Sequence, residues 1–89
     1  QDEKEIRILY SSLFLRSFEK LPAKIQSEFR RREDIFRRNP FDPILKTHKL
    51  KGRSDWAFLA TYEIRVVFYF KKDIFRFLNI GDHSIYRDK

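Results

Sequence analysis

Two apolar runs near the C-terminus, separated by three polar residues, constrain the fold of this chain more than any other feature. Residues Ile64–Phe70 and Ile74–Ile80 have the length and composition of β-strands, and Lys71-Lys72-Asp73 is suited to a hairpin turn. Strands so short and so close together pair in an antiparallel manner. Because both runs are almost continuously apolar, we expect much of this hairpin to be buried.

The N-terminal half predicts a strand followed by two helices. Residues Ile6–Tyr10 are typical of a short strand, and Ser11-Ser12 offers an N-cap for a helix that we expect to end at Lys20. Pro22 suits the first turn of a second helix, which ends before Asn39-Pro40. Two helices joined by so short a connection form an αα-hairpin. Apolar residues at helical spacing support both helices: Phe14, Phe18, Leu21, Ile25, Phe29 and Phe36.

The remaining segments complete the order of elements. Residues Phe41–Ser54 have a basic, irregular composition and predict a loop, whereas Trp56–Thr61 predicts a strand. The order is therefore β-α-α-β-β-β, an α+β fold in which a helical hairpin packs on one face of a small, mostly antiparallel sheet. With 89 residues and neither repeats nor linkers, the chain is expected to form one domain spanning residues 1–89.

The composition narrows the choice of partners and location. A net charge of +7 and a pI near 9.9 favour phosphate-rich or acidic partners, although such a charge also serves solubility alone. The absence of cysteine excludes a disulfide scaffold and a thiolate zinc site, and it fits a cytoplasmic protein. No apolar run approaches the roughly 20 residues of a membrane span, and the acidic, polar N-terminus does not resemble a signal peptide. The sequence therefore predicts no membrane association.

Four side chains near the predicted strand ends have the chemistry to cleave RNA without a metal or another cofactor. In such a cleavage the 2′-hydroxyl attacks the adjacent phosphorus. The protein accepts the hydroxyl proton, stabilises the charge on the phosphate and protonates the departing 5′-oxygen. An imidazole titrates near neutral pH and suits the proton transfers, whereas a guanidinium stays charged and binds phosphate. The candidate catalytic residues are His48, Arg65, His83 and Tyr86.

Both histidines also have structural alternatives. His48 could be an exposed loop histidine, and His83 could be a capping or surface residue. We expect Gly81 to give the backbone beside His83 unusual angles and to permit the close approach of a phosphate. The two histidines lie far apart in the sequence and have no flanking acidic cluster, so a metal site is not expected.

Arg65 and Tyr86 have structural alternatives as well. Arg65 interrupts an apolar strand, so it must either face a cleft or form a structural pair with Glu63 or Asp82. Tyr86 could stack on a nucleobase or cover the core as a hydrophobic lid.

Basic residues form two further clusters. The first is expected to hold RNA phosphates without reading sequence, or else to be a solvated loop. It comprises Lys46, Lys49, Lys51 and Arg53, with Arg87 near the C-terminus. The second lies on the long helix and could contact RNA, an acidic partner or only solvent. It comprises Arg30, Arg31, Arg32, Arg37 and Arg38.

The order and spacing of these motifs resemble the RelE/ParE superfamily of bacterial toxins, and the YafQ branch in particular. The resemblance rests on a basic loop that carries His48 and Lys51-Gly52 before Trp56, on the arginine of the strand Ile64–Phe68, and on the ending Gly81-x-His-x-x-Tyr. It covers nearly the whole chain. Ile64 departs from the family pattern, which usually has a tyrosine there.

The resemblance implies the toxin of a toxin–antitoxin pair, an endoribonuclease that cleaves mRNA on the ribosome without a metal and so inhibits translation. It makes His48 and His83 the proton-transfer residues, and it places Arg65 at the scissile phosphate and Tyr86 at a base or a hydroxyl. It also implies an acidic cognate antitoxin, with the toxin monomeric alone and hetero-oligomeric in the complex.

Two alternatives stay open. A ParE-type toxin inhibits DNA gyrase without being an enzyme, although such toxins typically lack the histidine and tyrosine set. A plain nucleic-acid-binding module would need only the basic residues.

Overall fold

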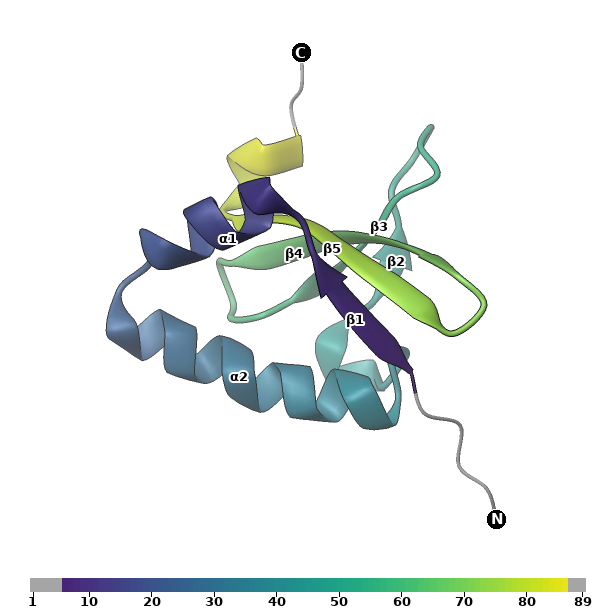
Figure 1. Ribbon diagram of the computed structural model, residues 1–89, viewed down its shortest axis with the longest axis horizontal. Coiled ribbons are helices and arrows are strands. Elements are labelled where there is room, and N and C mark those ends of the chain that lie inside the picture. The colour runs from purple at the N-terminus through teal and green to yellow at the C-terminus, as the bar shows by residue number, and fades with distance from the viewer. Residues whose placement is uncertain (1–5, 87–89) are drawn as a thin grey trace.

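The computed structural model describes residues 6–86, in which two helices pack on a five-stranded sheet (Figure 1). The sheet order is β1-β5-β4-β3-β2, with β1 parallel to β5 and every other pair antiparallel. The predicted α+β fold, a helical hairpin on a mostly antiparallel sheet, is confirmed. The elements in chain order are β1 Arg7–Tyr10, α1 Ser12–Glu19, α2 Ala23–Arg38, the 3₁₀ helix η1 Pro43–Leu45, β2 His48–Lys49, β3 Trp56–Leu59, β4 Arg65–Lys71, β5 Ile74–Gly81 and the 3₁₀ helix η2 His83–Tyr86.

Side chains satisfy the free backbone groups at the start of the helical hairpin and at the turn between its two helices. Ser11 is the N-cap of α1: its hydroxyl accepts a hydrogen bond from the Phe14 N–H at 2.9 Å and donates to the Leu78 carbonyl at 2.8 Å. Pro22 is the N-cap of α2, so it lies just before the helix and not in its first turn as predicted. The Gln26 side chain donates to the carbonyl of Phe18 at 2.9 Å, and thereby ties α2 to the end of α1.

The predicted loop Phe41–Ser54 contains more structure than expected, and its description as entirely irregular is wrong. Asp42 caps η1 by accepting a hydrogen bond from the Ile44 N–H at 3.0 Å. Strand β2 then pairs with β3, His48 opposite Ala57 and Lys49 opposite Trp56. A strand of two residues has no periodicity to detect, so only its pairing partner defines it.

A register shift in the β4–β5 hairpin decides which residues face the helices. Val67 pairs with Asn79 but Phe68 pairs with Phe77, so Leu78 is an extra residue, a β-bulge. Phe77 and Ile80 both belong to the core beneath the helices although three positions separate them. Strict alternation from Phe77 would have turned Ile80 to the opposite face. Leu78 packs instead on that opposite face, against Val67.

Aromatic rings fill the space between the helices and the sheet. Phe36 of α2 is fully buried, and its ring lies 4.7–5.4 Å from the rings of four other phenylalanines. Phenylalanine buries a large apolar area per residue, so these rings allow a short chain to form a continuous core. The four rings around Phe36 are those of Phe58, Phe68, Phe75 and Phe77.

We expect Phe36→Ala to lower the free energy of unfolding by about 3–5 kcal/mol, because it removes a buried ring and leaves a cavity among four others. Leu15→Ala, on the exposed side of α1, serves as the control and should change stability by no more than about 0.5 kcal/mol. Urea denaturation followed by circular dichroism measures both. Phe36→Leu leaves a smaller cavity and should give an intermediate loss, which keeps the comparison possible if Phe36→Ala does not fold. Equal losses in Leu15→Ala and Phe36→Ala would contradict this description of the core.

Candidate active site

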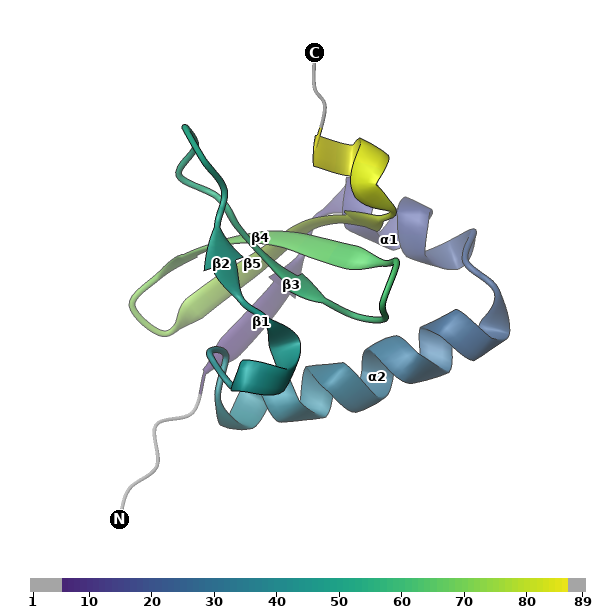
Figure 2. The ribbon, with the colours of Figure 1, turned by 180° about the vertical axis from the view of Figure 1, so that it is seen from behind.

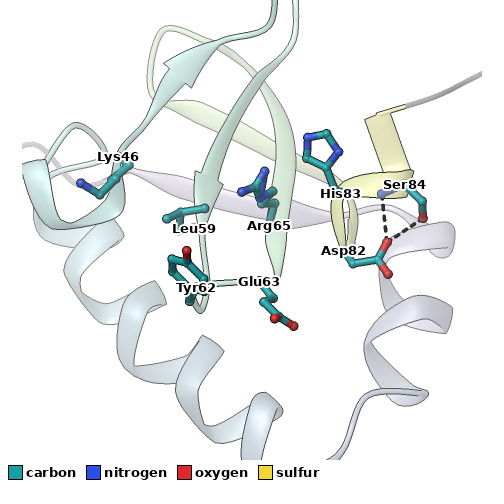
Figure 3. Close-up of a pocket in the computed structure, with 8 residues that line it drawn as sticks. All are labelled: Lys46, Leu59, Tyr62, Glu63, Arg65, Asp82, His83 and Ser84. Atoms are coloured by element: carbon teal, nitrogen blue, oxygen red, sulfur yellow. Dashed lines mark hydrogen bonds between the residues drawn. The ribbon is translucent and has the colours of Figure 1, made fainter.

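An open cleft of about 660 Å³ lies where β3, β4 and β5 reach one end of the sheet. Figure 3 places Lys46 at one side of this cleft and His83 at the other, with Arg65 between them. The lining residues come from the residue after η1, the end of β3, the β3–β4 turn, the start of β4 and the segment after β5. They are Lys46, Leu59, Tyr62, Glu63, Arg65, Asp82, His83 and Ser84.

Arg65 occupies the centre of the cleft because of its position in β4. It pairs with Leu59 on one side and with Gly81 on the other. Alternation along the strand puts Arg65 on the same face as Val67, away from the helices. Its guanidinium carbon lies 5.8 Å from the centre of the Tyr86 ring, a cation–π arrangement. Its Nε is buried and has no hydrogen-bond partner among the described residues.

Gly81 lets the chain fold closely over the end of β5, though not for the reason predicted. It does not have a positive φ, so the expected unusual backbone angles are absent. A Cβ at this position would lie 2.6 Å from the Ile85 Cγ2 atom of η2, closer than packing allows. Asp82 then stabilises the turn, accepting hydrogen bonds from the Ser84 N–H at 2.9 Å and the Ser84 hydroxyl at 2.6 Å. This turn sets the position of His83 at the rim of the cleft.

Tyr86 links His83 to Arg65 through its ring. The His83 and Tyr86 rings lie 5.1 Å apart at 71°. The ring also packs against a small apolar cluster of Leu50, Ala57 and Val67 on this face of the sheet, as expected for a lid. Burial raises the pKa of the Tyr86 phenol, and the positive charges of Arg65 and Arg53 oppose the increase. The phenol oxygen is itself buried without a hydrogen-bond partner in residues 6–86, so the part of Tyr86 that contacts its neighbours is the ring.

His48 is not among the residues that line the cleft. It is exposed on β2, with its Nδ1 atom 3.0 Å from the Lys46 carbonyl oxygen. Its pairing with Ala57 puts it on the same face as Arg65, but two strands away and further along the sheet. At about 4.8 Å per strand, the lateral separation alone is about 10 Å. The structure therefore brings Arg65, His83 and Tyr86 together and leaves His48 apart.

The predicted phosphate-binding residues take different positions. Lys46 lines the cleft, whereas Lys51 is exposed in the turn between β2 and β3. The Lys49 ammonium donates to the Arg53 carbonyl at 2.7 Å. Arg53 forms an ion pair with Asp55 at 2.7 Å and donates to the Tyr86 carbonyl at 3.3 Å, so it fastens this turn to η2. Arg87 lies outside the described residues.

The arginines of α2 are partly structural. Arg31 pairs with Glu28 at 2.8 Å, and Arg37 lies 3.7 Å from Glu33. Arg32 donates to the carbonyl oxygens of Ile44 at 3.2 Å and Leu59 at 3.3 Å, and so joins η1 to the end of β3. These contacts fix the two elements that carry one side of the cleft, a role that the sequence did not reveal.

Tyr62 and Glu63 also line the cleft, although Tyr62 was not predicted as a site residue and Glu63 was considered only as a structural partner of Arg65. Both lie in the short turn between β3 and β4, shortly before Arg65. A signal was available, because a turn that leads into a predicted active-site strand must lie at the same edge of the sheet as its first residue. The predicted strands Trp56–Thr61 and Ile64–Phe70 leave Tyr62 and Glu63 between them, but no function was assigned to this connection.

Neither a metal site nor a membrane span is found in residues 6–86. No group of three or more His, Cys, Asp or Glu side chains is placed to hold a metal ion. None of the helices combines the length and apolar character required to cross a bilayer.

The sequence matches no protein-family model and no curated protein, but solved structures match the fold closely. The E. coli DinJ-YafQ toxin-antitoxin complex aligns with a TM-score of 0.76 and 13% identity, covering 96% of this chain and 100% of that chain. A YoeB/ParE toxin from Agrobacterium tumefaciens aligns with a TM-score of 0.72 and 18% identity, covering 88% and 99%. The archaeal RelE-RelB complex from Pyrococcus horikoshii OT3 aligns with a TM-score of 0.72 and 16% identity, covering 91% and 98%.

At identities this low, the structural matches establish the fold alone. The chain has the fold of the RelE/ParE toxins, as the order and spacing of its motifs predicted. What the fold does in this chain depends on the side chains of the cleft.

We expect Arg65→Met to raise the pKa of Tyr86 further. The guanidinium charge stabilises the phenolate and lowers this pKa, whereas burial, the larger effect, would remain. A pH titration of ¹³Cζ-labelled tyrosine by NMR measures the change. Lys72→Met removes a charge in the β4–β5 turn and should leave the titration of Tyr86 as in the wild type. A pKa of Tyr86 that falls or stays constant in Arg65→Met would contradict the contact between guanidinium and ring.

Proposed function

We propose that this chain is the toxin of a toxin–antitoxin pair and acts as a metal-independent endoribonuclease on mRNA at the ribosome, inhibiting translation. The observation that carries the proposal is Arg65, which lies in an open cleft and whose buried Nε has no hydrogen-bond partner within residues 6–86. Placing a charged donor in a sheet without an acceptor is unfavourable unless an anion binds there. The fold shared with the RelE and YafQ structures supports the same class of function.

In the proposed reaction the scissile phosphate binds at Arg65. The 2′-oxygen forms a bond to phosphorus while the bond from phosphorus to the 5′-oxygen breaks. The products are a 2′,3′-cyclic phosphate and a free 5′-hydroxyl. Negative charge increases on the phosphate oxygens at the transition state, and a fixed guanidinium stabilises it without reorganising. The Tyr86 ring holds the guanidinium in this position from the side of the sheet.

Two proton transfers accompany this displacement. His83 lines the cleft and is suited to one of them. Tyr86 is not suited to act as the base, because burial raises the pKa of its phenol and disfavours the phenolate. It is also a poor donor to substrate, because the oxygen is buried. The second transfer therefore falls to a group outside the cleft lining, and His48 is the other histidine of the chain.

The same proposal includes a protein partner. YafQ and RelE are found in complexes with DinJ and RelB. We propose a corresponding antitoxin for this chain, acidic because it must complement a toxin with a net charge of +7. Toxin and antitoxin would meet in the cytoplasm, where the ribosome is.

We expect Arg65→Ala and His83→Ala each to slow mRNA cleavage by about 100-fold or more and to relieve growth arrest. The first removes stabilisation of the phosphate and the second a proton-transfer group. Primer extension on programmed ribosomes measures the rate, and the growth of expressing cells measures toxicity. Arg76→Ala, an exposed arginine of β5 outside the cleft, is the matched control and should cleave like the wild type.

Full cleavage by both variants at equal expression would contradict the nuclease mechanism. If the folded wild-type protein makes no cuts, the proposed function is wrong, and inhibition of DNA gyrase in a supercoiling assay is the next measurement.

We expect Lys46→Ala to weaken the binding of single-stranded RNA and to reduce the slope of log affinity against log salt by about 1, because one phosphate contact is lost. Lys72→Ala is a closely matched control. Both lysines have a positive φ, 53° for Lys46 and 55° for Lys72, so alanine meets the same backbone strain at either site. Lys72 lies in the β4–β5 turn, outside the cleft. Binding titrations at several salt concentrations measure the slopes, and equal slopes for both variants would exclude a phosphate contact at Lys46.

A further inference from the structure

Tyr62 is an aromatic side chain that the fold exposes instead of burying. It is 86% exposed, more than any other large hydrophobic side chain reported for residues 6–86, yet it lines the cleft that contains Arg65. Its ring has no aromatic contact within the described part of the chain, where most other rings pack against one another. Core packing therefore does not account for a tyrosine at this position.

The turn that carries Tyr62 is held in place by hydrogen bonds. The Thr61 hydroxyl accepts from the backbone N–H of Glu63 at 3.2 Å and of Ile64 at 3.0 Å. The N–H groups of Ala60 and Thr61 both donate to the Ile64 carbonyl, at 2.8 and 3.1 Å. The backbone at Tyr62 is thus fixed. A ligand that stacks on the ring therefore has to order only the Tyr62 side chain and not the turn.

The surroundings of Tyr62 suit a flat, neutral ring. Leu59 contributes an apolar surface beside it (Figure 3). Arg32 of α2 donates to the Leu59 carbonyl at 3.3 Å and so anchors this residue. Glu63 follows Tyr62 at the same end of the cleft, and its carboxylate repels phosphate. Lys46, Arg65 and His83 lie at other points of the lining and attract phosphate. Asp82 also lines the cleft beside His83, and its Oδ1 accepts two hydrogen bonds from Ser84.

From this division of charge we propose that Tyr62 binds a nucleobase of single-stranded RNA by stacking, at the nucleotide next to the phosphate held by Arg65. The inference rests on the proposed function, because it names the substrate contact that completes the same cleft. A duplex would keep its bases stacked on one another and unavailable, so the site selects unpaired RNA. Tyr62 would act by holding the substrate strand and not by moving a proton.

The test compares Tyr62→Ala with Tyr62→Phe and with Tyr69→Ala. Tyr69 is a second exposed tyrosine of the sheet that lies outside this cleft, so it controls for the loss of a surface ring. Cleavage is measured by primer extension on programmed ribosomes. Binding is measured separately by fluorescence anisotropy with a short, labelled, single-stranded 2′-O-methyl RNA, which cannot be cleaved because its 2′-oxygen is blocked. Urea denaturation confirms that each variant is as stable as the wild type, as expected for a side chain this exposed.

Removal of one stacking contact should weaken RNA binding by a factor between about 5 and about 150 in Tyr62→Ala. Tyr62→Phe should bind within about twofold of the wild type, since phenylalanine keeps the ring, and Tyr69→Ala should be unchanged. Loss of binding in Tyr62→Phe equal to that in Tyr62→Ala would overturn stacking in favour of the hydroxyl. Unchanged binding and cleavage in Tyr62→Ala would overturn the inference and leave the nuclease intact.

The two proposals can fail separately. If the wild type makes no cuts on ribosomes, the proposed function fails and the anisotropy measurement decides the inference alone. In that case the expected loss of binding in Tyr62→Ala would support an RNA site at Tyr62. Equal binding by wild type and variant, or no binding by either, would overturn it.

Discussion

The pairing of β4 with β5, including its bulge at Leu78, is the constraint on which both faces of this protein depend. If the two strands paired without the extra residue, the side chains of β5 that follow Leu78 would point to the opposite face of the sheet. The shift keeps Ile80 in the core with Phe77 and Val66, and it leaves Gly81 opposite Arg65 at the cleft. One inserted residue thus allows the hairpin to present apolar side chains to the helices and to place Arg65 at the cleft on the opposite face. Figure 2 shows the sheet from behind, where η2 and the turn between β2 and β3 rise on the side of the sheet away from α2.

The sequence predicted the parts of this fold that have periodic or boundary signals. Helices α1 and α2 and strands β1, β4 and β5 have such signals, and their bounds differ by only a residue or two from those expected. The parallel pairing of β1 with β5 and the two-residue strand β2 depend on contacts between distant segments, which no local pattern encodes. The bulge was also invisible, because Phe77 and Ile80 both read as apolar whichever face they take.

The same distinction explains the site. Arg65 was identifiable because a guanidinium within an apolar strand demands an explanation, and His83 because it follows a glycine at a strand end. Tyr62 lies between two predicted strands and has no sequence motif that marks it as functional, and Arg32 was one of several arginines on the long helix with no distinguishing neighbour in the sequence. His48 shows what sequence reasoning leaves open. A motif can place a residue in the correct segment, yet strand register puts His48 two strands from Arg65, outside the cleft lining.

This separation bears on how the cleft could work. A nuclease that acts on free RNA needs both proton-transfer groups fixed at the scissile bond, because most of the advantage comes from preset geometry. Here one imidazole lines an open cleft, and the other is on β2, two strands and about 10 Å across the sheet from the strand that carries Arg65. In the reaction that we propose, Arg65 stabilises the phosphate charge, and the open cleft leaves the path of the RNA strand loosely defined. A substrate held in a bent conformation by a larger surface would supply the missing restraint, and the ribosome is such a surface. The incompleteness of the site is therefore a physical argument for the ribosome dependence that we propose.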